Sequence, residues 1–473
     1  MAYESQLKSD RAQLHRRVAA VIENRDPGSV EENAALIAEH LEAAADLDVA
    51  FAWHMRAGTW STIREIAAAR TSWRRARQVA DRLPDDDPDR MANRIAPRTL
   101  LCATAFRVGG SGADTGFDEL RELCTVAGDQ RSLAIGMTGP VTEHLLKAHR
   151  HEVSRLATQH VRLLESIGDP MLTVALLHAA MAAKHETAEM TEVLRLAQRV
   201  IDLADGDPTK GDLIFGSPLA IAIAVRGTGR CCLGIRGWKD DFHHAIAMAR
   251  AVDPTTLASV MWFTHIIAIP NGVLPADATA LGYTAELLAV AEQSGDDFVL
   301  DLARTARGVA LVGQDGAERE AGLELLAKTR ERALDERFSL IALPVVDIHF
   351  AREKARLGDL DGASALARAL LDDLFDSGGS IWSALATSAL VEALAQRGGE
   401  ANLEDAQAAI DRLAAAPTDP GFVLHEIWLL RLRTLLARAH GDETRYREYR
   451  DRYHNTAKTL EFASHIAWAE AMP

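Results

Sequence analysis

One glycine-rich segment has the composition of a phosphate-binding loop. Residues 109–116 read Gly-Gly-Ser-Gly-Ala-Asp-Thr-Gly, and the backbone N–H groups of such a loop can hold an anion at the start of a helix. A P-loop also needs lysine and then serine or threonine directly after its last glycine. Phe117 and Asp118 occupy those positions, and Asp118 would repel a phosphate. We therefore predict a flexible connector over 107–116 and no cofactor site.

Three His-Glu pairs could each begin the helix of a zinc metalloprotease. They are His151-Glu152, His185-Glu186 and His425-Glu426. That chemistry needs a second histidine four residues after the first, because both rings must face the same side of the helix. The residues at those positions are Arg155, Glu189 and Leu429. The spacing therefore excludes a zinc site of this type.

A further group of metal-binding side chains lies between residues 240 and 244. Its members are Asp240, Asp241, His243 and His244. On a helix these side chains point in different directions, so we predict a solvated helix start. No Ser/His/Asp or Cys/His grouping stands out, and the 17 histidines are expected at the surface or in satisfied core positions. We expect no catalytic, metal or cofactor site, and a site hidden in the fold is the alternative.

The composition indicates which elements carry these residues. The 473 residues are 48% hydrophobic, 25% charged and 5% aromatic, which is the balance of a globular chain. Few aromatic residues, with frequent alanine, leucine and arginine, favour helices that pack through small side chains. At roughly 150 residues per domain, the length predicts three domains. Repeat proteins do not follow this relation between length and domain number.

The charge balance argues against nucleic acid as a partner. Lysine and arginine number 52 against 68 aspartate and glutamate residues, so the formal net charge is −16, and a phosphate backbone would be repelled. The densest basic run, Arg74, Arg75 and Arg77, is predicted to form a solvated helix surface.

We expect a cytoplasmic chain without a membrane span. The first 17 residues are polar and lack the apolar stretch of a signal peptide. The longest apolar run, 218–225, is far shorter than the roughly 20 residues that cross a bilayer. The cysteines have no C-x-x-C spacing and are predicted to be buried, reduced thiols. They are Cys102, Cys124, Cys231 and Cys232.

Helical periodicity organises most of the chain. After Pro27-Gly28, Ser29 and Glu32 have capping-box spacing, which predicts a helix start. Small residues at offsets of +4 and +7 then recur, and they let a neighbouring helix approach closely. These stripes are Val30, Ala34, Ile37 and Leu41; Ala50, His54 and Ala57; Ala69, Trp73 and Ala76; Ala363, Ala367 and Leu370; and Ala406, Ile410 and Leu413. Trp53, Trp60 and Trp73 are predicted to lie in the core, with a ligand groove as the alternative.

The stripes predict an all-α, irregular TPR-like α-solenoid, a right-handed superhelix of antiparallel helix pairs. Predicted turns lie at 168–170, 234–239, 295–297, 314–317 and 441–442, so the spacing is too uneven for a regular 34-residue repeat. Helix-breaking loops are expected at 107–116, 205–218 and 269–276. We predict a helical stub or linker over 1–28 and a solenoid over 29–473, with a possible internal boundary at 205–218.

Several strings resemble one known family. Residues 3–7 and 14–19 resemble the segment that follows the ATPase module in STAND-type ATPases, and residues 38–44 through 57–58 resemble the helical repeat after it. Three further strings resemble the C-terminal region of actinobacterial proteins that join a class III adenylate/guanylate cyclase domain, an AAA/STAND ATPase and a tetratricopeptide-like tail. These strings are 165–170, 269–273 and 465–473. The resemblance spans nearly the whole chain.

The resemblance implies a binding role and no chemistry for this chain. In that family the cyclase and the nucleotide site lie upstream of the matched region, so no catalytic residue carries over to a position here. Its tails are thought to restrain or release the ATPase when a ligand arrives. Our leading hypothesis is a non-catalytic sensor or scaffold that binds a protein partner or a small inducer. The alternatives are part of a cyclase or ATPase enzyme whose catalytic domains this chain lacks, and a small-molecule receptor with its pocket around 213–276.

Overall fold

The computed structural model describes residues 8–62, 64–108, 116–336 and 339–473, and these residues form helices and turns, with no strand among them. The predicted all-α class is therefore confirmed. The chain divides into two compact units. Unit 1 comprises residues 1–108, 112–140 and 294–297, and unit 2 comprises residues 109–111, 141–293 and 298–473. The predicted glycine-rich connector falls largely on 109–115, outside the described residues.

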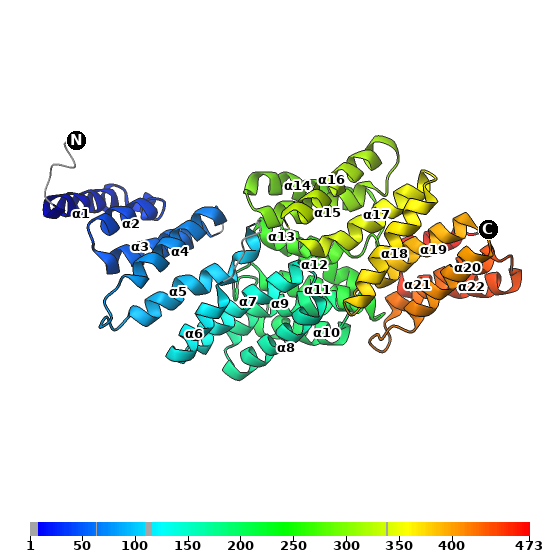
Figure 1. Cartoon of the computed structure of the whole chain (residues 1–473), viewed down its shortest axis with the longest axis horizontal. Helices are drawn as coiled ribbons and strands as arrows, with labels where there is room; N and C mark the ends of the chain where they lie inside the picture. The colour runs from blue at the N-terminus through cyan, green and yellow to red at the C-terminus, as the bar shows by residue number, and fades with distance from the viewer. Residues whose placement is uncertain (1–7, 63, 109–115, 337–338) are drawn as a thin grey trace. The chain divides into compact units, whose positions relative to one another are not determined.

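Unit 1 is a run of helices that pack mainly on their neighbours in the sequence. Its helices are α1 (Lys8–Arg25), α2 (Ala34–Ala43), α3 (Leu47–Ser61), α4 (Ile66–Asp81), α5 (Arg90–Ala103), α6 (Phe117–Ala127) and α7 (Gln130–Leu146), whose last residues belong to unit 2. Each of the first five packs on the helix that follows it (Figure 1). Short turns make such neighbours antiparallel, so unit 1 is built from helix-turn-helix pairs.

The predicted small-residue stripes of α3 and α4 are buried, and α3 packs on α4. Ala50, His54, Ala57, Ala69, Trp73 and Ala76 are all buried. A Cβ added at Gly58 would lie 2.2 Å from Nε1 of Trp73, so the indole fills the space that the glycine leaves open. A small residue on one helix thus faces a large one on its partner, as the pattern predicts.

The predicted capping box at the start of α2 is wrong. Ser29 and Glu32 precede the helix, which begins at Ala34 with Asn33 at the N-cap position and no side-chain cap bond. Asp26 instead caps a short 3-10 turn that starts with a proline. Aspartate followed by proline is a strong start signal in its own right, so the first turn starts at Pro27 and already includes Ser29.

Unit 2 contains the remaining helices. Its first half has α8 (Arg150–Ile167), α9 (Pro170–Glu186), α10 (Met190–Ala204), α11 (Pro218–Cys232), α12 (Trp238–Ala249), α13 (Pro254–Met261), a π-helical turn (Trp262–Ile266) and α14 (Ala278–Ser294). Its second half has α15 (Asp297–Leu311), α16 (Gly316–Glu336), α17 (Leu343–Arg356), α18 (Leu360–Asp376), α19 (Ser383–Arg397), α20 (Glu400–Ala414), α21 (Val423–Ala439), α22 (Glu443–Leu460) and α23 (Ala463–Glu470). Each of the five predicted turns begins between two of these helices, and four of them extend into the first one or two residues of the next helix.

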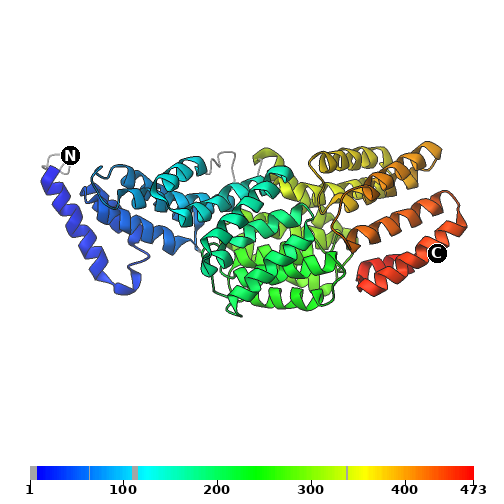
Figure 2. The ribbon, with the colours of Figure 1, turned by 90° about the horizontal axis from the view of Figure 1, so that it is seen from below.

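Helices of unit 2 pack on their neighbours and also on the next helix but one. Besides the consecutive pairs, α9 packs on α11, α11 on α13, α17 on α19 and α19 on α21. Contacts of this kind stack successive helix pairs into a solenoid. Figure 2 shows the C-terminal helices, in yellow to red, following one another in this way.

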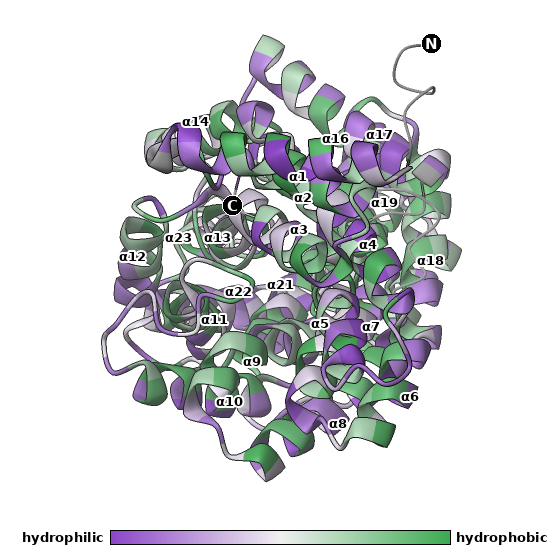
Figure 3. Ribbon diagram, turned by 90° about the vertical axis from the view of Figure 1, so that its left-hand side faces the viewer, coloured by the Kyte–Doolittle hydropathy of each residue, from purple (hydrophilic) through white to green (hydrophobic). Residues whose placement is uncertain are grey.

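Helix α11 is the central helix of unit 2. It packs on α9, α10, α12, α13 and α21, and residues 218–225 are all buried. The longest apolar run of the sequence is therefore a core helix. Surface helices such as α10 carry hydrophobic and hydrophilic residues on different sides (Figure 3). Within the described ranges, no helix is both long enough and apolar enough to cross a bilayer.

The predicted loop at 269–276 packs against α23. The N–H of His465 donates to the carbonyl of Gly272 at 3.2 Å, and its Nε2 donates to the carbonyl of Asn271 at 2.9 Å. Gly272 has φ +71°, and a Cβ there would lie 2.6 Å from the ring of Trp468. The strings at 269–273 and 465–473, singled out separately in the sequence, thus form one packed contact.

Candidate functional site

A cavity of about 690 Å³ lies in unit 2 where the start of α8 faces α17 and α18. We call it the α8–α18 groove. It is lined by Lys147, Ala148, His149, Arg150, His151, Glu152, Leu340, Leu343, Pro344, Asp347, Leu366, Ala369, Leu370, Asp373 and Ser377. Its volume is within the roughly 300–1,000 Å³ that binding sites usually enclose.

Helix α18 forms one wall because it is apolar on two faces. One face packs into the core through Ala363, Ala367, Leu371 and Leu374. On the second face, Leu366 and Leu370 are half-buried and line the groove. A helix that is apolar on two sides packs against two partners, so the second face is suited to a bound molecule.

The predicted core position of Leu370 is therefore wrong. The stripe through Ala363 and Ala367 continues to Leu371, at offsets of +4 and +8. The residue at +7 lies on the edge of that stripe, because 3.6 residues complete one helical turn. Leu370 thus turns toward the groove, where Leu340 and Leu343 at the start of α17 add half-buried apolar surface.

Arg150 is the buried charged residue of the groove. Its side chain is 2% exposed, with Nε 3.0 Å from Oε1 of Glu186 and Nη1 donating to Oγ of Ser377 at 2.8 Å. Nη2 has no hydrogen-bond partner among the residues that the structure describes. Buried N–H groups without a partner are uncommon in folded proteins, so the hydrogen bonding of Arg150 is incomplete at Nη2.

Glu186 balances the charge of Arg150. It is also 2% exposed and accepts a second hydrogen bond from Oγ of Ser380 at 3.1 Å. Burial raises the pKa of Glu186, and the charge of Arg150 opposes that rise. Removing one member of a buried ion pair costs about 3–5 kcal/mol, so this pair fixes the start of α8 to the end of α9.

The rim of the groove carries charges of both signs. Lys147 pairs with Glu143 at 2.5 Å, and Asp347 pairs with Arg330 at 2.6 Å. Asp373 is 73% exposed. The groove therefore combines an apolar floor with a mixed polar rim, which is the composition of a protein-binding surface.

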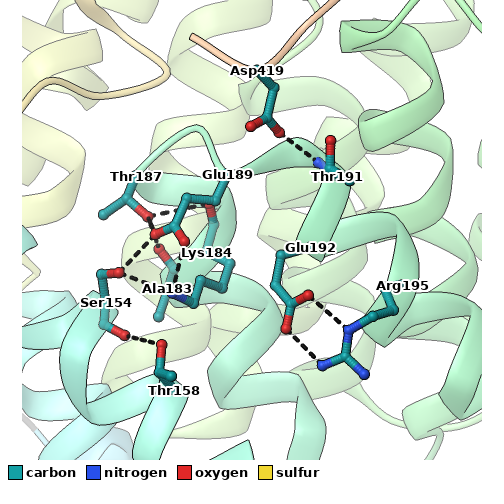
Figure 4. Close-up of polar contacts among 10 residues, drawn as sticks. All are labelled: Ser154, Thr158, Ala183, Lys184, Thr187, Glu189, Thr191, Glu192, Arg195 and Asp419. Atoms are coloured by element: carbon teal, nitrogen blue, oxygen red, sulfur yellow. Dashed lines mark hydrogen bonds and ion pairs between the residues drawn. The ribbon is translucent and has the colours of Figure 1, made fainter. Parts of the chain in front are cut away.

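A polar cluster holds the turn between α9 and α10 (Figure 4). Its centre is Glu189, which accepts hydrogen bonds from Ser154 at 2.6 Å, Lys184 at 2.7 Å and Thr187 at 2.7 Å. Burial raises the pKa of the Glu189 carboxyl, but these hydrogen bonds hold it below its usual value. The cluster anchors this turn to α8.

The same cluster contains a serine beside a lysine, the pairing of some nucleophilic enzymes. Nζ of Lys184 donates to Oγ of Ser154 at 2.9 Å, and Ser154 donates to Glu189. Because Lys184 forms an ion pair with Glu189, it acts as a hydrogen-bond donor to Ser154 and not as its base. The geometry supports a structural role for this cluster.

The structure separates the candidate metal ligands. His151 and Glu152 are exposed at the groove, while His185 is buried and Glu186 pairs with Arg150. In the described ranges no three histidine, cysteine, aspartate or glutamate side chains converge as a metal site would require. His425 is buried beside an exposed Glu426.

The solvated helix start predicted at residues 240–244 holds for three of its four members. Asp240, His243 and His244 are exposed, but Asp241 is buried. Its two carboxylate oxygens lie 2.7 Å from Arg226 and 2.9 Å from Arg230. These arginines come from α11, one helix earlier, so the local pattern could not reveal the pair.

The tryptophan and arginine predictions hold for most of their members. Trp53 and Trp73 are buried as predicted, whereas Trp60 is only half-buried. Arg74 and Arg75 are exposed as predicted, and Arg77 is half-buried. The four cysteines are buried free thiols, and burial raises the pKa of Cys124 to about 11. A raised pKa disfavours the reactive thiolate.

Comparison with known proteins adds little beyond the geometry. No family model matches the sequence, and no curated protein matches it. A crystal structure of yeast Tom70 is similar at 13% identity, over 98% of this chain and 96% of that chain, with a TM-score of 0.34. At this TM-score no property of Tom70 transfers, and the fold described above rests on the helix packing of this chain.

Sequence reasoning missed the groove because its walls come from distant parts of the chain. Residues 147–152 and residues 340–377 meet only after folding. One local signal was present: α18 carries Leu366 and Leu370 beside its core stripe. An additional apolar face on a repeat helix points to a surface that needs a partner.

Proposed function

We propose that this chain is a non-catalytic helical-repeat module that binds an amphipathic helix of a partner protein in the α8–α18 groove. The observation that carries this proposal is the second apolar face of α18, where Leu366 and Leu370 are only half-buried and line the groove. Helix-in-groove recognition uses such a row of apolar anchors.

The charges of the groove support the same kind of partner. Arg150 places a buried positive charge at the groove, and the carboxylate of Asp373, 3.9 Å from Nη1 of Arg150, is 73% exposed. A partner helix with an apolar stripe between an acidic and a basic residue complements this arrangement. Charged rim contacts of this kind mainly set orientation and specificity.

We further propose that the partner is the ATPase portion of a cyclase–ATPase signalling protein, of which this chain corresponds to the tail. The support is the resemblance of strings along the chain to that family. Two of those strings, 269–273 and 465–473, pack together through His465. The residues that carry the resemblance in these two strings therefore contact one another in the fold of this chain.

Isothermal titration calorimetry against the separately expressed ATPase portion of such a protein tests the proposal. The titration is done without nucleotide and with ATP. We expect binding by the unaltered chain and at least about tenfold weaker binding by Leu370→Glu, because burying one leucine contributes about 1.5–3 kcal/mol. Absence of heat in both nucleotide states would contradict the ATPase assignment.

Leu357→Glu is the matched control. Leu357 is another leucine of this region, 69% exposed at the end of α17, and it does not line the groove. Both substitutions add the same charge, and thermal melting checks that both proteins fold. If the two variants bind the partner equally well, the partner does not bind in the α8–α18 groove.

A further inference from the structure

A second cavity in unit 2, of about 330 Å³, lies beside the contact between the 269–276 loop and α23. Its apolar lining comes from Ile269, Pro270, Pro275, Ala276, Val309, Val312, Leu323 and Trp468. Its charged and polar lining comes from Arg319, His349, Arg352, Glu353 and Ser464. This volume is near the lower end of the roughly 300–1,000 Å³ of ligand sites, which suits a small molecule.

The positive charge at this cavity is incompletely balanced. Two arginines, Arg319 and Arg352, line it with one carboxylate, Glu353. Glu353 lies 2.6 Å from the exposed Arg356 on its own helix and 3.9 Å from Arg319. Among the described residues, the other ion pair of Arg319 is with Asp315, at 3.8 Å. Its guanidinium therefore has N–H groups to offer to an anion.

A second guanidinium lies behind Arg352. Arg431 and Arg352 share Glu392, at 3.1 Å and 3.5 Å, and Arg352 also donates to Ser388 at 2.9 Å. Among the described residues, Nε and Nη1 of Arg431 and Nε of Arg352 are buried without a hydrogen-bond partner. One carboxylate thus serves two guanidinium groups, and the surroundings of the cavity stay basic.

His349 also lines the cavity. Its Nε2 has no hydrogen-bond partner in the part of the chain that the structure describes. Burial, followed by the charges of Arg352 and Arg319, lowers the pKa of His349 to about 3. The ring is therefore neutral at pH 7. A neutral imidazole can donate one hydrogen bond without adding a third charge.

The ring of Trp468 forms the aromatic part of the wall. The guanidinium of Arg431 lies 5.0 Å from the centre of this ring, which keeps the indole in place through a cation–π contact. The ring is half-buried and lines the cavity. It offers a flat apolar surface beside the arginines.

We propose that this cavity binds a small organic monocarboxylate, whose carboxylate is held by Arg319 and Arg352 and whose apolar body lies against Trp468. Two arginines and one glutamate give the lining one net positive charge, which matches the single negative charge of a monocarboxylate. The planar guanidinium group of arginine also fits the geometry of a carboxylate. The apolar walls disfavour a bare inorganic ion, which would lose its hydration there. This site is separate from the groove, and the proposal does not depend on partner binding.

Thermal-shift titration with matched acids and amides tests the proposal on the full chain. The probes are benzoate, phenylacetate and indole-3-acetate, each compared with its own amide, which has the same shape and no charge. We expect at least one acid to raise the melting temperature in a saturable way, while its amide does not. Failure of all three acids, or equal effects of acid and amide, would overturn the proposal.

The variant Arg319→Gln tests whether the acid binds in this cavity. The ion pairs of Arg319 are long and contribute little to stability, so the variant is expected to fold. The affinity for the acid is expected to fall about tenfold or more, since a hydrogen bond to a charged group is lost. Arg195→Gln is the control, because Arg195 is 50% exposed and pairs with glutamates outside the cavity. Binding by Arg319→Gln as tight as that of the control would contradict the site.

Trp468→Phe supplies an independent readout. Binding of the acid is expected to change tryptophan fluorescence in the unaltered protein. In Trp468→Phe the thermal shift should persist while most of this fluorescence change disappears. An undiminished fluorescence change in the variant would place the ligand elsewhere and overturn the assignment.

Discussion

Buried histidines are the residues that make this fold sensitive to acid. Burial lowers the pKa of His185 and His465 to about 3 and of His178 and His265 to about 4. All four lie in unit 2. Each ring is neutral in the folded chain, whereas the same ring becomes charged below pH 6.5 once the chain unfolds. Unit 2 must therefore lose stability as the pH falls from 6.5 toward 4.

His185→Leu isolates one of these rings. His185 is 1% exposed, packs edge-on against Phe263 at 5.2 Å, and has no partner for Nε2 among the described residues. In the unaltered protein the unfolded state binds the extra proton first, so stability falls as pH drops below 6.5. We expect the free energy of unfolding to vary less steeply in the variant, by about 1.4 kcal/mol per pH unit between pH 4.5 and 6.

Chemical denaturation at a series of pH values measures this difference. Every other titrating group is common to both proteins, so the difference in slope belongs to His185. Phe263→Leu is the control, because it disturbs the same contact without removing a titratable group. It should lower stability by a similar amount at each pH. Equal slopes for His185→Leu and the unaltered protein would show that His185 is not the buried neutral ring described.

At the scale of helices, two glycines set the distance between α15 and α16. A Cβ at Gly308 would lie 2.7 Å from Leu326, and a Cβ at Gly322 would lie 2.8 Å from the backbone nitrogen of Val312. Backbone atoms cannot rotate away as a side chain can. The two helices must therefore separate if Gly322 gains a side chain.

Gly322→Ala is expected to destabilise unit 2 by about 1–3 kcal/mol, the usual cost of overpacking. Gly282→Ala is its control in α14, where a Cβ would meet nothing within 4 Å. Alanine there should stabilise the helix by about 0.5–1 kcal/mol. Urea denaturation distinguishes the two, and a stabilised Gly322→Ala would mean that the helices are not in close contact at this point.

The helices and their core faces were predictable, because periodicity is a local property of the sequence. Alanine stripes such as Ala406 with Ile410 are buried as expected. Pairings between distant segments were not predictable. Arg150 binds Glu186 from 36 residues away and Ser377 from 227 residues away, and no local spacing records such contacts. The groove depends on these pairings, so it emerged only from the structure.

At the scale of the molecule, the chain divides into two compact units, and buried residues lie within each. In unit 1, Trp53 packs with Ala34, Ile37 and Ala57 in one cluster, and Trp73 packs with Ile66 and Leu101 in another. In unit 2 the core is organised around α11. Separate cores allow each unit to open on its own, and hydrogen exchange reports such openings helix by helix.

Gly58→Ala and Gly322→Ala test this independence as a pair. In unit 1 a Cβ at Gly58 would lie 2.2 Å from the buried ring of Trp73, so Gly58→Ala should loosen α3 and α4. We expect faster amide exchange in the helices of unit 1 for Gly58→Ala and in those of unit 2 for Gly322→Ala. Each variant then serves as the control for the other, because both add one methyl group at a helix contact. Faster exchange throughout the chain in either variant would mean that the two cores open as one cooperative unit.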